Sequence, residues 1–140
     1  MVEKGRYVDV NVFIYWLGKH PVYGEKAFDW IQKIENAPPG SYVTSTLTIY
    51  EVMVILAGLT GASLNDKAFI DQVINAIINL RGLFIEPLKL EDCIRALYLM
   101  ENYEIDYEDA IHLSTALRIG AIEIVSNDID FDKTPLRRIF

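Results

Sequence analysis

Four carboxylates stand in unusually apolar parts of the chain and have the clearest capacity for chemistry. Asp9 and Glu51 are each the only charged residue among eleven, in segments 7–17 and 47–57, whereas Asp109 and Asp128 border apolar segments. Carboxylates are rarely buried unless they are paired, hydrogen-bonded or bound to a cation. Four acids drawn towards one core therefore predict a site for a hard divalent metal. Oxygen ligands favour Mg²⁺ or Mn²⁺.

The nitrogen and sulfur ligands that zinc prefers are sparse in this sequence. The single cysteine, Cys93, and the two histidines, His20 and His112, form no cluster with metal-ligand spacing. His112 lies in an apolar helical pattern, where a histidine is more often a hydrogen-bonded core residue than a ligand. His20 precedes a proline at the end of a helix and is interpreted as structural.

Two of the acids also have structural interpretations, because they stand near expected helix starts. Asp9 could cap a helix, although Asn11 lies nearer its predicted start and is the expected cap. Asp109 stands three residues after Asp106, the spacing of a capping box, and such a role can coexist with a functional one. Glu108 is expected to point to another face of that helix.

The other two acids are open to different structural interpretations. Glu51 has no opposite charge three or four residues away, so it either serves a site or lies at the exposed rim of a buried helix. Asp128 and Asp130 lie in a cluster of Asn and Asp residues that is typical of turns. We expect Asp128 to serve the site and Asp130 to assist it or to hold the loop.

Alternating strand and helix patterns predict the elements that bring these acids together. Such alternation indicates right-handed crossovers and an α/β fold, a three-layer α/β/α sandwich with a small, mainly parallel sheet. The working site of such a fold lies beyond the carboxyl ends of the strands, where Asp9 and Asp128 are expected. The predicted strands are 6–10, 42–45, 83–86, 122–125 and 138–140, and the predicted helices are 11–18, 24–35, 47–57, 65–80, 90–101 and 107–118.

Length and composition restrict the class of protein. The 140 residues suit a single domain, 1–140, and 51% hydrophobic with 24% charged residues excludes a disordered chain. No apolar run approaches the roughly 20 residues of a membrane span. Residues 1–6 lead into a strand-like segment without an apolar signal region, so a cytoplasmic protein without membrane association is expected.

The net charge of −7 argues against broad electrostatic binding of nucleic acid, which usually needs a basic face. It does not exclude nucleic-acid chemistry, because bound cations would cancel part of the charge. Basic residues near the two ends of the chain could still form a local patch; the candidates are Lys4, Arg6, Lys19, Lys133, Arg137 and Arg138.

The order and spacing of the acidic motifs resemble those of PIN domains, most closely the VapC-type toxin ribonucleases of VapBC toxin–antitoxin pairs. The resemblance rests on residues 7–12, 45–52, 107–116 and 124–132, and covers nearly the whole chain. It implies a PIN-like fold with catalytic, metal-binding acids, supported by a polar residue and a hydroxyl. The matching acids are Asp9, Glu51, Asp109 and Asp128, and the supporting residues are Asn11 and Ser126.

The same resemblance implies an activity and partners. We expect an endoribonuclease that uses Mg²⁺ or Mn²⁺ to activate water, a small antitoxin occupying the acidic groove, and a homodimer. The alternatives are a stand-alone PIN nuclease in RNA processing and a non-catalytic module that binds RNA or protein. One departure is that the third motif often reads Tyr-Asp-Ala, whereas Glu108 intervenes here.

Two other enzyme classes fit the sequence less well. A phosphotransferase of the haloacid dehalogenase type needs a second Asp two residues after the first, where this chain has Asn11. A response-regulator receiver needs a pair of acids beside the first strand and a Lys after a late strand. Asp9 stands alone, and Val125 is followed by Ser126.

Overall fold

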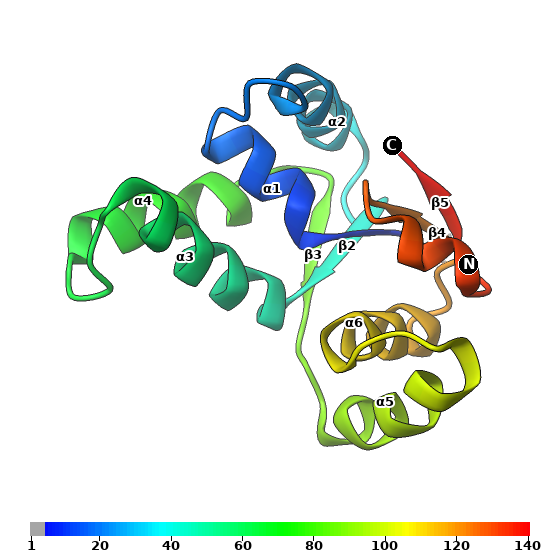
Figure 1. Ribbon diagram of the computed structural model, residues 1–140. Coiled ribbons are helices and arrows are strands. Elements are labelled where there is room, and N and C mark those ends of the chain that lie inside the picture. Colours follow the sequence, from blue (N-terminus) through cyan, green and yellow to red (C-terminus); the bar gives the residue numbers. More distant parts are fainter. Residues whose placement is uncertain (1–4) are drawn as a thin grey trace.

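A parallel sheet forms the centre of the computed structural model, which describes residues 5–140 (Figure 1). Within that range the sheet has five strands in the order β3-β2-β1-β4-β5, and every pairing is parallel. The predicted α/β class is confirmed. The strands are β1 (Arg6–Val8), β2 (Tyr42–Ser45), β3 (Leu83–Glu86), β4 (Glu123–Val125) and β5 (Arg137–Ile139).

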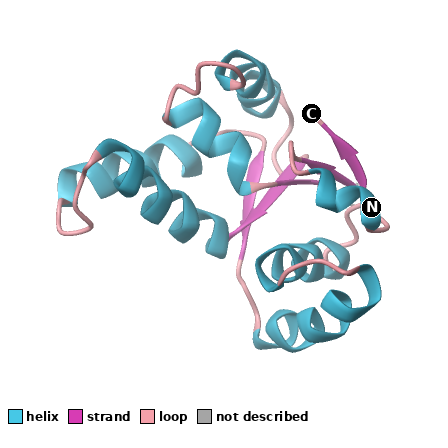
Figure 2. Cartoon of the chain, viewed as in Figure 1, coloured by secondary structure: helices cyan, strands magenta, loops and turns pink. Residues whose placement is uncertain are grey.

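Helices cover both faces of this sheet, as Figure 2 shows. One buried cluster joins the first four helices to the sheet, and a second joins the last two helices and the 3-10 turn to its other face. The expected three-layer α/β/α sandwich is therefore confirmed. The helices are α1 (Val10–Leu17), α2 (Gly24–Asn36), α3 (Thr46–Thr60), α4 (Lys67–Ile78), α5 (Leu90–Tyr103) and α6 (Tyr107–Arg118), with the 3-10 turn η1 (Ile129–Lys133).

The element boundaries differ from the predicted ones where a side chain competes with the sheet. β1 ends at Val8 because Asp9 already caps α1, which begins at Val10. α3 runs three residues beyond its predicted end and stops before Gly61, which adopts the left-handed conformation (φ 75°) that glycine tolerates. In the described residues, no helix is long and apolar enough to cross a membrane.

Ile94, Leu97 and Tyr98, apolar residues at helical spacing in α5, do not face the core. All three are more than 60% exposed, whereas Ala96 and Leu99 are buried against α6. The buried face of α5 also includes the acid Asp92, which is fully buried. Hydrophobic spacing alone therefore predicts the wrong buried face for α5, because the charged residue Asp92 lies on the face that packs against α6.

Asp92 joins α5 to α6 and so holds the helix that carries Asp109. Its carboxylate accepts hydrogen bonds from Arg118 Nε (2.8 Å) and Nη2 (2.9 Å), and from the Thr115 hydroxyl (3.1 Å). Arg118 also donates from Nη1 to Glu86 at the end of β3 (2.6 Å). The pair thus ties α5, α6 and the sheet together.

Removing the buried carboxylate should destabilise the fold. We expect Asp92→Ala to lower the free energy of unfolding by about 3 kcal/mol, because Arg118 keeps its charge and loses its main partner. Urea unfolding measures this loss. Asp71→Ala is the matched control, because Asp71 is exposed on α4 and bonds only to Asn75 among the described residues. Equal losses in the two variants would contradict the role of Asp92.

Candidate functional site

Asp9 both caps α1 and points one carboxylate oxygen towards the neighbouring strand. Its Oδ1 accepts from the Val10 amide (2.8 Å), and its Oδ2 accepts from the Ser126 hydroxyl (2.7 Å). The prediction that Asn11 would cap this helix is wrong, because the strand ends two residues earlier than expected. Asp9 is 6% exposed, and burial, as the main cause, raises its pKa above the ordinary value.

Ser126 and Asn11, the predicted supporting residues, connect the ends of β1 and β4. The Asn11 amide donates to Asp9 Oδ2 and to the Ser126 hydroxyl oxygen, each at 3.3 Å. The Ser126 oxygen also accepts from the Asp128 amide (3.0 Å). These bonds fix Asp9 relative to the segment that carries Asp128.

Three aspartates from α6 and the segment after β4 form a group that we call the aspartate group: Asp109, Asp128 and Asp130. One carboxylate oxygen from each lies within 4.8 Å of those of the other two. Asp106 accepts from the Asp109 amide (2.9 Å), which confirms its predicted capping role. Asp128 caps η1 by accepting from the Asp130 amide (2.9 Å).

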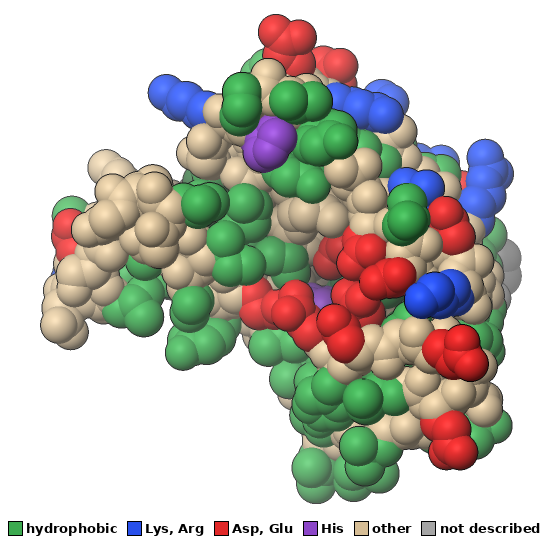
Figure 3. Space-filling model, in the orientation of Figure 1, with side chains coloured by type: hydrophobic (Ala, Val, Ile, Leu, Met, Phe, Trp, Pro, Cys, Tyr) green, Lys and Arg blue, Asp and Glu red, His purple; other side chains and the backbone are tan. Residues whose placement is uncertain are grey.

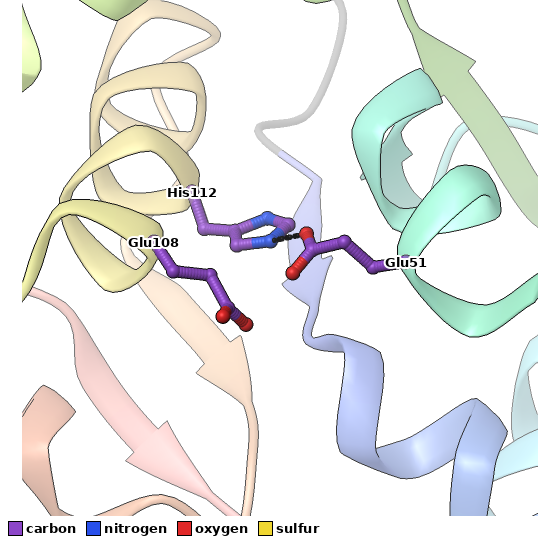
Figure 4. Close-up of side chains that lie close together, drawn as sticks. All are labelled: Glu51, Glu108 and His112. Atoms are coloured by element: carbon purple, nitrogen blue, oxygen red, sulfur yellow. Dashed lines mark hydrogen bonds and ion pairs between the residues drawn. The ribbon is translucent and has the colours of Figure 1, made fainter. Parts of the chain in front are cut away.

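A second group comprises Glu51, Glu108 and His112 (Figure 4), and we call it the glutamate–histidine group. Glu51 extends from α3, whereas Glu108 and His112 extend from successive turns of α6. Glu108, expected to point to another face of α6 than Asp109, reaches towards Glu51 and still lines the cleft. Sequence offered one signal for this residue, its spacing of four from His112, which places both on one helix face.

His112 bridges Glu51 and Tyr7 through its two ring nitrogens. Nε2 bonds to Glu51 Oε1 (2.5 Å), and Nδ1 bonds to the Tyr7 hydroxyl (2.6 Å). His112 is 1% exposed, so the prediction of a hydrogen-bonded core histidine is confirmed. His20 accepts from the amides of Val22 and Tyr23, which confirms its structural role.

A cleft of about 210 Å³ brings most of these acids together. Its lining includes the side chains of Asp9, Asn11, Glu108, Asp109 and Asp128. Figure 3 shows the acidic side chains as one cluster at the centre of this face. Three of the four predicted acids thus share the cleft. Glu51 lies beside it through Glu108, and Asp130 lies beside it through the aspartate group.

The electrostatics of the cleft are dominated by like charges. Burial, and then the nearby carboxylate of Asp128, raise the pKa of Asp109 to about 7. The adjoining Glu51, and then burial, raise the pKa of Glu108 to about 7. Among the ion pairs of the described residues, Lys133 is the only lysine or arginine that pairs with one of these acids, Asp130 (3.4 Å).

The residues present fit a divalent metal. The aspartate group offers oxygen ligands, which suit Mg²⁺ or Mn²⁺. The raised pKa of Asp109 shows that its negative form lacks compensation by the protein, and a bound cation would supply that compensation. Asp109 and Asp128 are the best-placed ligands, and Asp9 lines the same cleft.

The uncompensated negative charge of Asp109 should lower the free energy of unfolding of the metal-free protein. The folded-state pKa of Asp109 is about 7, above the ordinary 3.8, because the folded protein favours the neutral acid. The contribution of Asp109 to folding stability is therefore fully present below about pH 4 and is lost as the pH rises through about 7. We expect Asp109→Asn to raise the free energy of unfolding by about 1 kcal/mol at about pH 8 in EDTA. Thermal unfolding at both ends of this pH range measures it.

The free energies of unfolding of the parent protein and of Asp109→Asn should become equal at about pH 4, where the native aspartic acid is neutral, like the amide that replaces it. A variant no more stable than the parent at about pH 8, or equally stabilised at both pH values, would contradict the uncompensated charge.

Comparisons with known proteins agree with this arrangement. The PIN domain family matches residues 6–136. A toxin–antitoxin complex from Klebsiella pneumoniae is similar in structure, with TM-score 0.67 and 22% identity over 95% of this chain and 99% of that chain. Mycobacterium tuberculosis VapC20, a toxin that cleaves the sarcin–ricin loop, has TM-score 0.73 and 12% identity over 91% and 93% of the two chains.

VapBC2 from Rickettsia felis, bound to a promoter DNA fragment, has TM-score 0.67 and 18% identity over 96% of each chain. At these identities the solved structures show a shared fold. No curated protein sequence matches the chain. The family match covers nearly all of the chain, and two of the expected acids, Asp9 and Asp128, follow the carboxyl ends of β1 and β4. The chain therefore belongs to the PIN domain family.

Proposed function

We propose that this protein is a metal-dependent endoribonuclease, and that it is the toxin of a VapBC-type toxin–antitoxin pair. The observation that carries the proposal is the cleft in which Asp9, Asp109 and Asp128 meet, with Glu51 held beside them. Its chemistry suits Mg²⁺ or Mn²⁺ and a phosphodiester. Membership of the PIN family supports a nuclease, and the three similar structures support a toxin.

The proposed mechanism assigns a task to each side chain. Asp9, Asp109, Asp128 and Glu51 would hold the metal, and a bound divalent cation would neutralise charge on the scissile phosphate and lower the pKa of a water molecule. Ser126 keeps Asp9 Oδ2 oriented towards the cleft (2.7 Å).

Proton transfer in this mechanism is assigned to a side chain of α6. Glu108, whose pKa is about 7, can hold or release a proton at neutral pH, as a general acid or base requires. His112 keeps Glu51 ionised: although burial opposes ionisation, the hydrogen bond from His112 lowers the pKa of Glu51. The two glutamates therefore differ in protonation although they lie side by side.

The proposed partners follow from charge and from the exposed apolar surface. An acidic cleft in a chain of net charge −7 suits a basic segment of an antitoxin, with an arginine entering the cleft. Two of the similar structures are toxin–antitoxin complexes, which supports such a partner. The exposed side chains of α5 offer an apolar surface to a second copy; they are Leu90, Ile94, Leu97 and Tyr98.

Cleavage of RNA by an amide variant of Asp9 tests the proposed function. We expect Asp9→Asn to lower the rate of Mg²⁺-dependent cleavage about 100-fold or more, because the amide cannot neutralise a bound cation. Asn also caps helices well, so the fold should persist. The measurement is the cleavage rate of a mixed pool of single-stranded and structured RNA, with Mg²⁺, Mn²⁺ or EDTA.

Asp66→Asn is the matched control, because Asp66 also caps a helix, α4, by accepting from the Phe69 amide, and is not part of the cleft lining. We expect it to cleave at the parental rate. Cleavage that survives EDTA or Asp9→Asn would contradict the metal site. A folded protein that cuts no RNA under any metal would instead favour the non-catalytic binding module.

A further inference from the structure

A second cavity, of about 700 Å³, lies between α2 and the β5 edge of the sheet and gathers basic side chains. Its lining includes Arg6, Lys33, Arg137 and Arg138, together with Trp30 and one acid, Glu123. Figure 3 shows lysine and arginine side chains above and to the right of the acidic cluster. The four cations are a large share of the 13 in a chain of net charge −7.

Three of these cations were among the residues predicted to form a basic patch. Arg6, Arg137 and Arg138 do gather here, and Lys33 joins them from α2. Lys19 lines a different cavity, Lys133 pairs with Asp130, and Lys4 lies outside the described residues. The sequence could not reveal Lys33, because only the folded sheet brings α2 beside β5.

The structure holds two of the cations in fixed positions. Lys33 Nζ lies over the Trp30 ring, 4.2 Å from its centroid. Arg6 donates from Nε to Glu123 Oε1 (2.8 Å) and from Nη1 to the Tyr42 hydroxyl (3.2 Å). Groups that are already ordered lose less entropy when they bind a ligand.

Acids offset only part of this positive charge. Arg138 is paired with Asp132 (2.9 Å), and Glu123 is shared by Arg6 and Arg137. The Glu123 carboxylate lies 3.7 Å from Arg137 Nη1, whose side chain is 78% exposed. A guanidinium has five N–H donors, so Arg6 and Arg137 keep donors for a second anion. The cavity therefore retains a net positive charge and the geometry to bind phosphate oxygens.

A chain of contacts joins this cavity to the acidic cleft. Arg138 Nη1 donates to the carbonyl of Ser126 (3.3 Å), and the Ser126 hydroxyl donates to Asp9 (2.7 Å). Arg138 thus lies between the two sites, whereas Arg6, Glu123 and Arg137 stand at the amino ends of their strands. The cavity therefore extends from the cleft along the β5 edge by about the 10 Å of a three-residue strand. A strand that passes through the cleft can reach the cavity over this edge.

We propose that this basic cavity binds the phosphodiester backbone of the RNA strand next to the cleaved bond; the inference rests on the proposed function. An acidic cleft repels a polyanion, so the affinity for RNA must come from cations outside it. The cavity supplies them about one short strand's length from the cleft. Its contacts are with the backbone, so they hold the strand without selecting its sequence.

Binding of RNA by a non-cleaving protein tests this proposal separately from catalysis. The parent is Asp9→Asn, and the probe is a fluorescein-labelled single-stranded RNA of mixed sequence, followed by fluorescence anisotropy across NaCl concentrations. We expect added Lys33→Glu and Arg137→Glu to raise Kd about 30-fold or more. The slope of log K against log[NaCl] should fall by about 1.4, as two lost phosphate contacts require.

The matched control adds Arg81→Glu and Arg95→Glu, which change the net charge equally at exposed positions outside the cavity lining. We expect less than about a threefold change in Kd, because distant surface charges are screened by salt. The single change Arg137→Ala should raise Kd about threefold or more without disturbing packing, since that side chain is 78% exposed.

Equal weakening by the two double variants would show general electrostatics and would overturn the proposal. Parental affinity in the cavity variants would overturn it as well. Failure of the proposed function is distinguishable, because it would appear as absent cleavage by the unmutated protein even where cavity-dependent binding is found.

Discussion

Repulsion among buried carboxylates is the constraint on which the rest of this structure depends. Asp9 and Asp109 lie in one cleft with Asp128, and the pKa values of Asp9 and Asp109 are raised because burial and neighbouring acids oppose their ionisation. A protein selected only for stability would separate or neutralise such groups. Their retention in one cleft is the physical reason to assign them to a cation and to phosphodiester chemistry.

The scaffold keeps the acids together by anchoring each one through a different element. Ser126 fixes Asp9 from β4, His112 fixes Glu51 across the gap between α3 and α6, and the Asp92–Arg118 pair fixes α6 itself. The parallel pairing of β1 with β4 places Asp9 and Ser126 side by side where both strands end. The positive side chains lie outside the cleft, so the part proposed to bind metal and the part proposed to hold RNA are spatially separate.

Local pattern was enough to predict the fold class and most of the polar residues that line the cleft, because isolated acids in apolar segments mark strand ends and helix starts. Local pattern failed to predict features that depend on contacts between segments far apart in the sequence. Glu108 lies in the site because Glu51 approaches it from α3. The apolar residues of α5 face outward because Asp92, on the opposite face of this helix, pairs with Arg118. Asn11 lost its capping role to Asp9 through a strand two residues shorter than expected. No pairing of this kind is encoded in spacing along the chain.

Calorimetric titration of Mn²⁺ into the protein, in buffers of different ionisation enthalpy, tests the central claim most directly. Cation binding at acids whose pKa is about 7 must displace protons. The account predicts saturable binding with about half a proton or more released near pH 7, and release falling towards zero near pH 9. Absence of binding, or binding with no proton release at either pH, would contradict a metal site built on uncompensated carboxylates.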